Sequence, residues 1–153
     1  MKTILVLMTV VMLSVTNGCT QNSDYVASNE SKATTLEHLT AVQFKKLIFD
    51  YEKNKTWSFK GDIPVIIDFY ADWCKPCKML APTLETLQKE YKGKIKIYKV
   101  DTQVERELAG AFNITGIPAL LFIPKEGQPQ MSTGLIPKED LEKMIGEVLK
   151  VKK

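Results

Sequence analysis

The pentapeptide Trp73-Cys74-Lys75-Pro76-Cys77 stands between an apolar run at residues 64–70 and a helix-like stretch that begins at Lys78. Two cysteines separated by two residues, placed where a strand passes into a helix, suit reversible disulfide chemistry. In the first turn of a helix the two thiols lie close enough to bridge, and the free N–H groups there favour a thiolate. The pattern therefore indicates a redox-active pair, with half a zinc site or a structural disulfide as alternatives.

The rest of the chain offers little to a metal ion. A zinc site needs about four ligands, and beyond Cys74 and Cys77 the sequence holds only Cys19 and one histidine, His38. We therefore expect no metal and no cofactor. The net charge of +3 is small and spread along the chain, so we expect no binding to nucleic acid.

The motifs around the pentapeptide resemble the thioredoxin superfamily in order and spacing, over a region from about Leu36 to Leu149. The matching motifs are residues 65–79, Pro82, residues 99–101, residues 115–118, Gly127 and Gly134. Lys75 differs from the glycine of ordinary thioredoxins, and Ala119 from the threonine that usually follows the proline. The resemblance implies the α/β class and a thioredoxin fold, with a mixed central sheet flanked by helices.

The same resemblance implies a division of labour between the cysteines. We expect Cys74, as the more exposed thiolate, to attack a substrate disulfide, and Cys77 to resolve the mixed disulfide. Asp68 would accept the proton of Cys77, and Lys99 would lie near this acid. Burial should raise the pKa of the Asp68 carboxyl, which suits that role. The alternative for Asp68 is a structural acid with satisfied hydrogen bonds.

Substrate contacts are expected around the cysteine pair. By resemblance Pro118 is cis, and the Ile117 backbone can pair with an extended substrate; otherwise Pro118 only marks the start of a strand. Lys75 either favours the Cys74 thiolate through its charge or only tunes partner choice. The expected substrate-contacting residues are Tyr70, Trp73, Lys75, Pro76, Ile117, Pro118 and Gly134.

The expected reaction is reduction of protein disulfides. A Cys-Xaa-Pro-Cys pair with an aspartate and a lysine resembles thioredoxin more than the thiol oxidases, which commonly carry histidine before the second cysteine. A cytochrome c maturation reductase is another alternative, although such relatives usually carry a central insertion that this chain lacks. A module of another class, which binds peptides without catalysis, would not need an intact cysteine pair.

Local patterns place the remaining elements. Thr40 suits an N-cap for a helix bearing Phe44 and Ile48, and Asp101 or Thr102 suits a cap for a helix bearing Val104. Trp57 and Phe59 alternate with polar residues and fit either a strand or packing over an edge. The other expected elements are strands at 65–69 and 95–100, a helix from Cys74 to Gly93, a hairpin at 119–133 and a helix from Pro137.

The first residues are typical of an export signal. Residues 1–18 combine a positive start with an apolar core too short for an ordinary spanning helix, so an uncleaved membrane anchor is the less favoured alternative. Gly18-Cys19 resembles a lipobox, although Thr16 and Asn17 depart from it. We expect a lipidated Cys19, the alternative being ordinary cleavage that leaves this cysteine free or removes it.

The domain assignment follows: a signal peptide at 1–18, a polar tether at 19–35 and a thioredoxin-like domain at 36–153. The tether is rich in Ser, Thr and Asn and cannot bury enough apolar surface to fold alone. The expected location is the periplasm, with the domain held at the membrane by its lipid. The expected partners are disulfide-containing exported proteins and an electron donor that is membrane-embedded or a small thiol.

Overall fold

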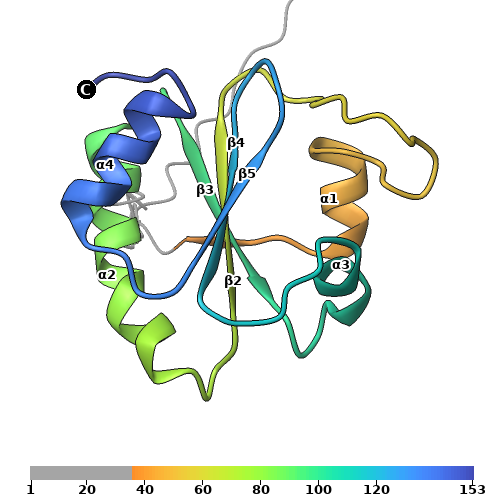
Figure 1. Cartoon of the computed structure of the whole chain (residues 1–153), viewed down its shortest axis with the longest axis horizontal. Coiled ribbons are helices and arrows are strands. Elements are labelled where there is room, and N and C mark those ends of the chain that lie inside the picture. Colours follow the sequence, from red (N-terminus) through yellow and green to blue (C-terminus); the bar gives the residue numbers. More distant parts are fainter. Residues whose placement is uncertain (1–35) are drawn as a thin grey trace, which may run out of the picture. The chain divides into compact units, whose positions relative to one another are not determined.

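A central mixed sheet carries the described part of the chain, with helices on both of its faces (Figure 1). This computed structural model describes residues 36–153, so the expected signal peptide, tether and lipidated Cys19 lie outside the described residues. The elements are β1 Glu37–His38, α1 Ala41–Leu47, β2 Val65–Tyr70, α2 Lys75–Glu90, β3 Lys96–Asp101, α3 Arg106–Ala111, β4 Ala119–Ile123, β5 Gln130–Thr133 and α4 Lys138–Glu147. None of the helices in this part has the length and apolar character needed to span a bilayer.

The strand order is β1-β3-β2-β4-β5. Strands β1, β3 and β2 run parallel, whereas β4 and β5 are antiparallel to their neighbours. Helices α2 and α4 cover one face of the sheet and α1 and α3 the other (Figure 1). The mixed sheet flanked by helices, which the sequence predicts, is confirmed.

Strand β2 lies at the centre of the sheet, and all six of its residues are buried. Because side chains alternate along a strand, Ile66 packs with α2 and α4, while Ile67 and Phe69 pack with α1 and α3. Asp68 and Tyr70 therefore share the α2 face with Ile66. The buried acid and the cysteine-bearing helix consequently lie on the same side of the sheet.

Helix α2 is anchored by apolar residues spaced three and four apart. Leu80, Leu84 and Leu87 are buried against the sheet, as the helical spacing predicts. Pro76 occupies the first turn, where a missing N–H removes no helical hydrogen bond. Gly93, with φ of +78°, follows the end of the helix, where a left-handed residue reverses the chain.

The start of α3 differs from the expectation. The sequence suggests Asp101 or Thr102 as the cap, but the N-cap residue is Glu105 and Val104 is largely exposed. Asp101 is the last residue of β3, and its carboxylate accepts a hydrogen bond from the Gln103 N–H at 2.9 Å. The helix therefore begins three or four residues later than expected, and Val104 lies in the turn before it, exposed to solvent.

Two further features are set by packing between distant segments. Strand β1 has only two residues and was not anticipated; it pairs with Tyr98 and Lys99 of β3. Trp57 and Phe59 form no strand and instead pack against the α1 face of the core. The ring centroids of Trp57 and Phe49 lie 4.7 Å apart. The strand alternative for these aromatics is therefore wrong, and both side chains pack against the core.

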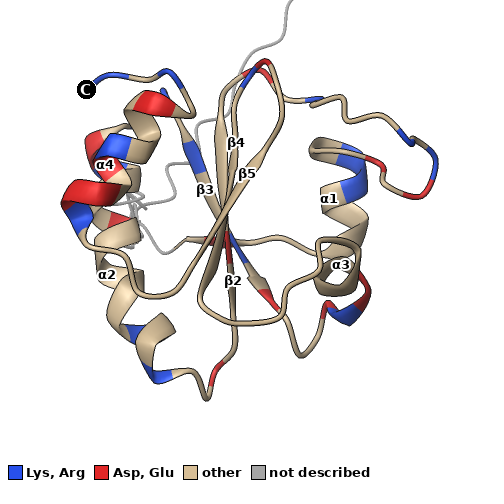
Figure 2. Ribbon diagram, viewed as in Figure 1, with Lys and Arg blue, Asp and Glu red and all other residues tan. Residues whose placement is uncertain are grey.

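Charged residues lie mainly on the helices and loops, and α4 carries both signs (Figure 2). At the C-terminus the Lys153 ammonium pairs with Glu90 and Glu142, each at 2.7 Å. These exposed ion pairs contribute little free energy. They do place the end of the chain beside α2 and α4.

Candidate active site

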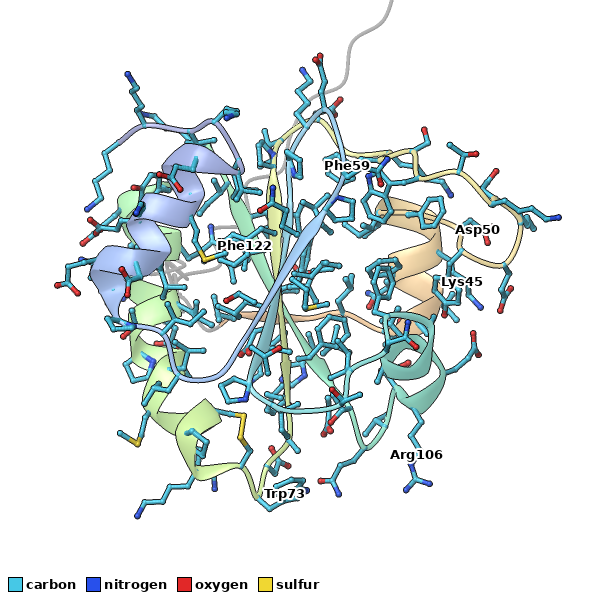
Figure 3. The ribbon with its side chains drawn as sticks, viewed as in Figure 1. Lys45, Asp50, Phe59, Trp73, Arg106 and Phe122 are labelled. Atoms are coloured by element: carbon cyan, nitrogen blue, oxygen red, sulfur yellow. A yellow bond between two sulfur atoms is a disulfide. The ribbon has the colours of Figure 1, made fainter. Side chains whose placement is uncertain are left out.

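Both cysteines are positioned by the junction between β2 and α2. Cys74 is the N-cap residue of the helix, and its N–H donates to the Ala71 carbonyl at 3.0 Å. The Cys77 N–H donates to the Cys74 sulfur at 3.2 Å. The two sulfurs form a disulfide with an S–S distance of 2.02 Å and a Cα–Cα distance of 5.3 Å, visible as the yellow bond at the start of α2 (Figure 3).

The expected difference in exposure between the cysteines is wrong for this oxidised form. Cys74 is 2% exposed and Cys77 is 3% exposed, because both pack with Tyr70 and Ala71 and against Ile117. They differ instead in what they face. Cys74 lines an outer groove, and Cys77 lines a separate inner cavity.

The outer groove has a volume of about 390 Å³ and brings most of the expected substrate-contacting residues together. It is lined by Trp73, Cys74, Lys75, Pro76, Thr102, Ile114, Thr115, Gly116 and Ile117. Trp73 is 70% exposed and points away from the domain beside the disulfide (Figure 3). An exposed indole next to a reactive sulfur provides an apolar surface for a partner chain.

The peptide bond between Ile117 and Pro118 is cis, as the sequence resemblance implies. The Pro118 carbonyl accepts a hydrogen bond from the Gly134 N–H at 2.8 Å. Gly134 has φ of +103°, a backbone conformation that residues other than glycine rarely adopt. Gly134, directly after β5, thus supports the proline and is not among the residues that line the groove.

The inner cavity, with a volume of about 210 Å³, lies on the other side of the disulfide. It is lined by Asp68, Tyr70, Ala71, Asp72, Cys77, Lys78, Ala81 and Lys99. Asp68 is 3% exposed, and its Oδ1 atom has no hydrogen-bond partner among the described residues. Cys77 and the acid expected to take its proton therefore line the same small cavity.

Burial raises the pKa of the Asp68 carboxyl from 3.8 to about 7, although the Lys99 ammonium lowers it. A carboxylate deprived of water is destabilised relative to its neutral form, and no donor here compensates it. A group with a pKa near neutral accepts and releases protons efficiently at physiological pH. The geometry and the pKa together make Asp68 chemically suited to exchange a proton with Cys77.

Some site residues were not predicted. The Thr102 N–H and hydroxyl both donate to the Tyr70 carbonyl, at 2.9 and 3.0 Å, and fix the end of β2. Ile114 and Thr115 line the groove from the loop after α3. Thr115 belongs to the motif at residues 115–118, whereas the only sequence signal for Thr102 and Ile114 is that they adjoin the motifs at 99–101 and 115–118. In the part of the chain described here, no cluster of three His, Cys, Asp or Glu residues could hold a metal ion.

Comparisons with known proteins agree with this geometry. A family model described as Thioredoxin matches residues 36–147. Thioredoxin of Borreliella burgdorferi is 47% identical over 107 residues, which cover 70% of this chain and 92% of that protein. Thioredoxin of Bacillus subtilis is 41% identical over 85 residues, covering 56% of this chain and 82% of that one. The crystal structure of chloroplastic thioredoxin z superimposes with a TM-score of 0.64 at 26% identity, covering 76% of this chain and 96% of that one.

The raised pKa of Asp68 predicts a pH-dependent effect of Asp68→Asn on stability. Between pH 3.8 and about 7 the folded protein holds a proton that the unfolded chain has released, so its stability falls as pH rises. The variant lacks this penalty. Its free energy of unfolding relative to the natural protein should therefore increase from about pH 5 to pH 8, by on the order of 3 kcal/mol. Urea unfolding of the oxidised proteins at both pH values measures this difference.

The matched control is Asp62→Asn, which neutralises an exposed carboxyl in the loop before β2. Its effect on stability should be small and nearly the same at both pH values, because an exposed carboxylate keeps its water. A difference between Asp68→Asn and the natural protein that stays constant across this pH range would contradict the raised pKa.

Proposed function

The chain belongs to the thioredoxin family, and from that premise we propose that it reduces disulfides of exported proteins through Cys74 and Cys77. Membership makes it an enzyme, a thioredoxin-like protein-disulfide reductase with a redox-active cysteine pair. The observation that carries the proposal is the position of the disulfide. It lies between a groove lined by Cys74 and a second cavity that Cys77 and the buried Asp68 both line.

The reaction begins with the dithiol form. The Cys74 thiolate attacks one sulfur of a substrate disulfide, that S–S bond breaks, and its electron pair leaves on the other substrate sulfur. The product is a mixed disulfide between Cys74 and the substrate. Cys74 is suited to this step because it opens on the groove and caps the helix, whose N-terminal N–H groups stabilise a thiolate. The exposed Lys75 ammonium at the first helical position adds to this effect.

The second step takes place on the inner side. Cys77 transfers its proton to the Asp68 carboxylate, and the resulting thiolate attacks the Cys74 sulfur. The mixed disulfide breaks, the substrate leaves with its second thiolate, and the Cys74–Cys77 disulfide described here is the product. Two electrons have passed from the enzyme to the substrate. A dithiol donor, membrane-embedded or small, must return them before the next cycle.

The direction of electron flow rests on the residues around the pair. Lys75 and Pro76 separate the cysteines, so the histidine common before the second cysteine of oxidases is absent. The buried Asp68 with Lys99 beside it favours formation of the Cys77 thiolate, which a reductase needs in every cycle. A binding module without catalysis would have no use for a cysteine pair placed this way.

The proposed location follows from the N-terminal sequence. A charged start and an apolar core at residues 1–18 support export, and Cys19 supports attachment to a lipid. The polar tether at 19–35 would let the domain reach disulfide-containing proteins near the periplasmic side of the membrane.

The two cysteines should differ in what their variants trap. Cys77→Ser keeps the attacking thiolate but cannot resolve the product, so it should accumulate mixed disulfides with substrates such as insulin. Cys74→Ser should lose insulin reduction and trap little. Non-reducing gels followed by mass spectrometry of the linked peptides measure both outcomes. Efficient trapping through Cys77 in the Cys74→Ser variant would reverse the assigned roles.

Anchoring is tested separately from catalysis. In a bacterial host, Cys19 should become acylated and the protein should partition with membranes, because two or more acyl chains make attachment stable. Cys19→Ala should release the protein in soluble form or block its processing, and Cys19→Ser serves as the conservative control. A mature protein that begins after residue 19 and carries no lipid, as determined by mass spectrometry, would refute the lipoprotein assignment.

A further inference from the structure

Tyr70 is expected to contact substrate, yet it does not line the outer groove. It lines the inner cavity with Asp68 and Lys99. Asp68 and Tyr70 project from the same face of β2, two residues apart, and Asp68 pairs in register with Lys99 of β3. The Lys99 ammonium lies over the Tyr70 ring, 4.1 Å from its centroid. The three side chains thus form one contiguous group beside Cys77.

We propose that Tyr70 is a positioning residue whose ring face holds the Lys99 ammonium at the wall of the inner cavity that joins Asp68 to Cys77. The functional meaning of this contact rests on the proposed role of Asp68 as proton acceptor. The contact itself does not depend on that role, and its effect on the carboxyl is measurable without turnover.

Few other groups fix the position of the Lys99 side chain. Among residues 36–153 the ion pairs within 4.0 Å do not include Lys99, so no carboxylate fixes its ammonium directly. A lysine side chain is long and flexible, and its strongly hydrated ammonium tends to extend into water. A cation over an aromatic face gains about 0.5 to 2 kcal/mol, increasing with desolvation. The Tyr70 ring therefore decides where this charge lies.

The Tyr70 ring is itself held in place by its neighbours. Tyr70 is 9% exposed, and Thr102 hydrogen-bonds twice to its carbonyl oxygen. The Tyr70 hydroxyl lies 3.5 Å from Nδ1 of His38, and the two rings meet edge to face at 5.9 Å. Burial, with the nearby carboxylates of Asp101, Asp72 and Asp68, raises the pKa of Tyr70 to about 12. The phenol is neutral at working pH, so it attracts the ammonium through its ring face and not as an ion pair.

Several other titratable and charged groups lie near Asp68. The groups that share its cavity are Lys99 from β3, Cys77 and Lys78 from α2, Tyr70 from β2 and Asp72 from the following turn. A second cavity of about 520 Å³, which Tyr70 and Lys99 also line, brings in His38 from β1, Asp101 from β3 and Glu105. Of all these groups, Lys99 is the one whose charge opposes the effect of burial on the Asp68 carboxyl. Displacing this one ammonium should therefore shift the pKa of the Asp68 carboxyl by a measurable amount.

Removing the Tyr70 ring should change the pKa of Asp68 in one direction. Without the ring face, the ammonium would extend into water, where distance and salt weaken its attraction for the Asp68 carboxylate. The pKa of Asp68 would then rise further above its ordinary value. More of the carboxyl would be protonated at neutral pH and unable to accept the Cys77 proton.

The test is a pH titration of the Asp68 carboxyl by carbon-13 NMR, on the full chain with the Cys74–Cys77 disulfide intact. In this form neither cysteine of the pair titrates, so the titration of Asp68 is not coupled to that of a thiol. Tyr70→Leu removes the ring face and should raise the midpoint by roughly 0.5 to 1 unit, the scale of one partly screened charge. Lys99→Met should raise it similarly. Tyr70→Phe keeps the ring face and loses only the hydroxyl, so its midpoint should stay close to that of the natural protein.

The double variant Tyr70→Leu with Lys99→Met separates a specific contact from general loosening of the core. If the ring acts through the lysine, Tyr70→Leu should add no further shift once Lys99 has become methionine. Equal shifts in both backgrounds would overturn the proposal, as would a lowered midpoint in Tyr70→Leu. A shift in Tyr70→Phe as large as in Tyr70→Leu would assign the effect to the hydroxyl and His38 and also overturn it.

One measurement needs no variant and applies even if Tyr70→Leu does not fold. The ε-methylene protons of Lys99 should be shifted upfield by the Tyr70 ring in the natural protein, and ordinary lysine shifts there would overturn the proposal. If the midpoints behave as expected but Asp68→Asn resolves mixed disulfides at the natural rate, the contact stands and the proton-acceptor role fails.

Discussion

The passage from β2 to α2 is the constraint on which the rest of the structure depends. Strand β2 is the central strand, paired with β3 on one side and β4 on the other, and all of its residues are buried. Its end is fixed by Thr102, and the helix starts directly after Cys74. Because both ends of this junction are fixed, the sulfur of Cys74 must lie at the helix N-terminus and that of Cys77 must face the sheet. A disulfide with one sulfur toward the groove and one toward the buried acid follows from that geometry.

Asp68 is the residue of this site that lowers the stability of the fold. A carboxyl that is 3% exposed, with one oxygen lacking a hydrogen-bond partner, destabilises the fold once it ionises. The same burial brings its pKa to about 7, where a proton acceptor works best. Lys99 limits the shift without forming a direct ion pair, which would lower the pKa far below neutral. The site thus combines instability and reactivity in a single group, as strained functional sites commonly do.

Sequence reasoning predicted the parts that depend on local pattern. A periodic or family signal is present in the apolar run of β2, in the spacing of Leu80 and Leu84, and in the cysteine motif. These signals together predicted the mixed sheet. The parts it missed depend on contacts between distant segments. The two residues of β1 are a strand only because β3 lies beside them. Burial of Cys74 depends on the packing of Ile117 against it. No sequence pattern near Tyr70 predicts that the Tyr70 ring lies on the Cys77 side of the disulfide.

The most direct measurement is the rate at which Cys77 releases substrate from a preformed mixed disulfide on Cys74, as a function of pH. Release can be followed in a single turnover with a fluorescent disulfide peptide, for the natural protein and for Asp68→Asn. If Asp68 takes the Cys77 proton, the variant should release the peptide more slowly at pH 7, and the deficit should shrink as pH rises and Cys77 ionises without help. Equal release rates at pH 7 would contradict this mechanism and leave Asp68 as a structural residue.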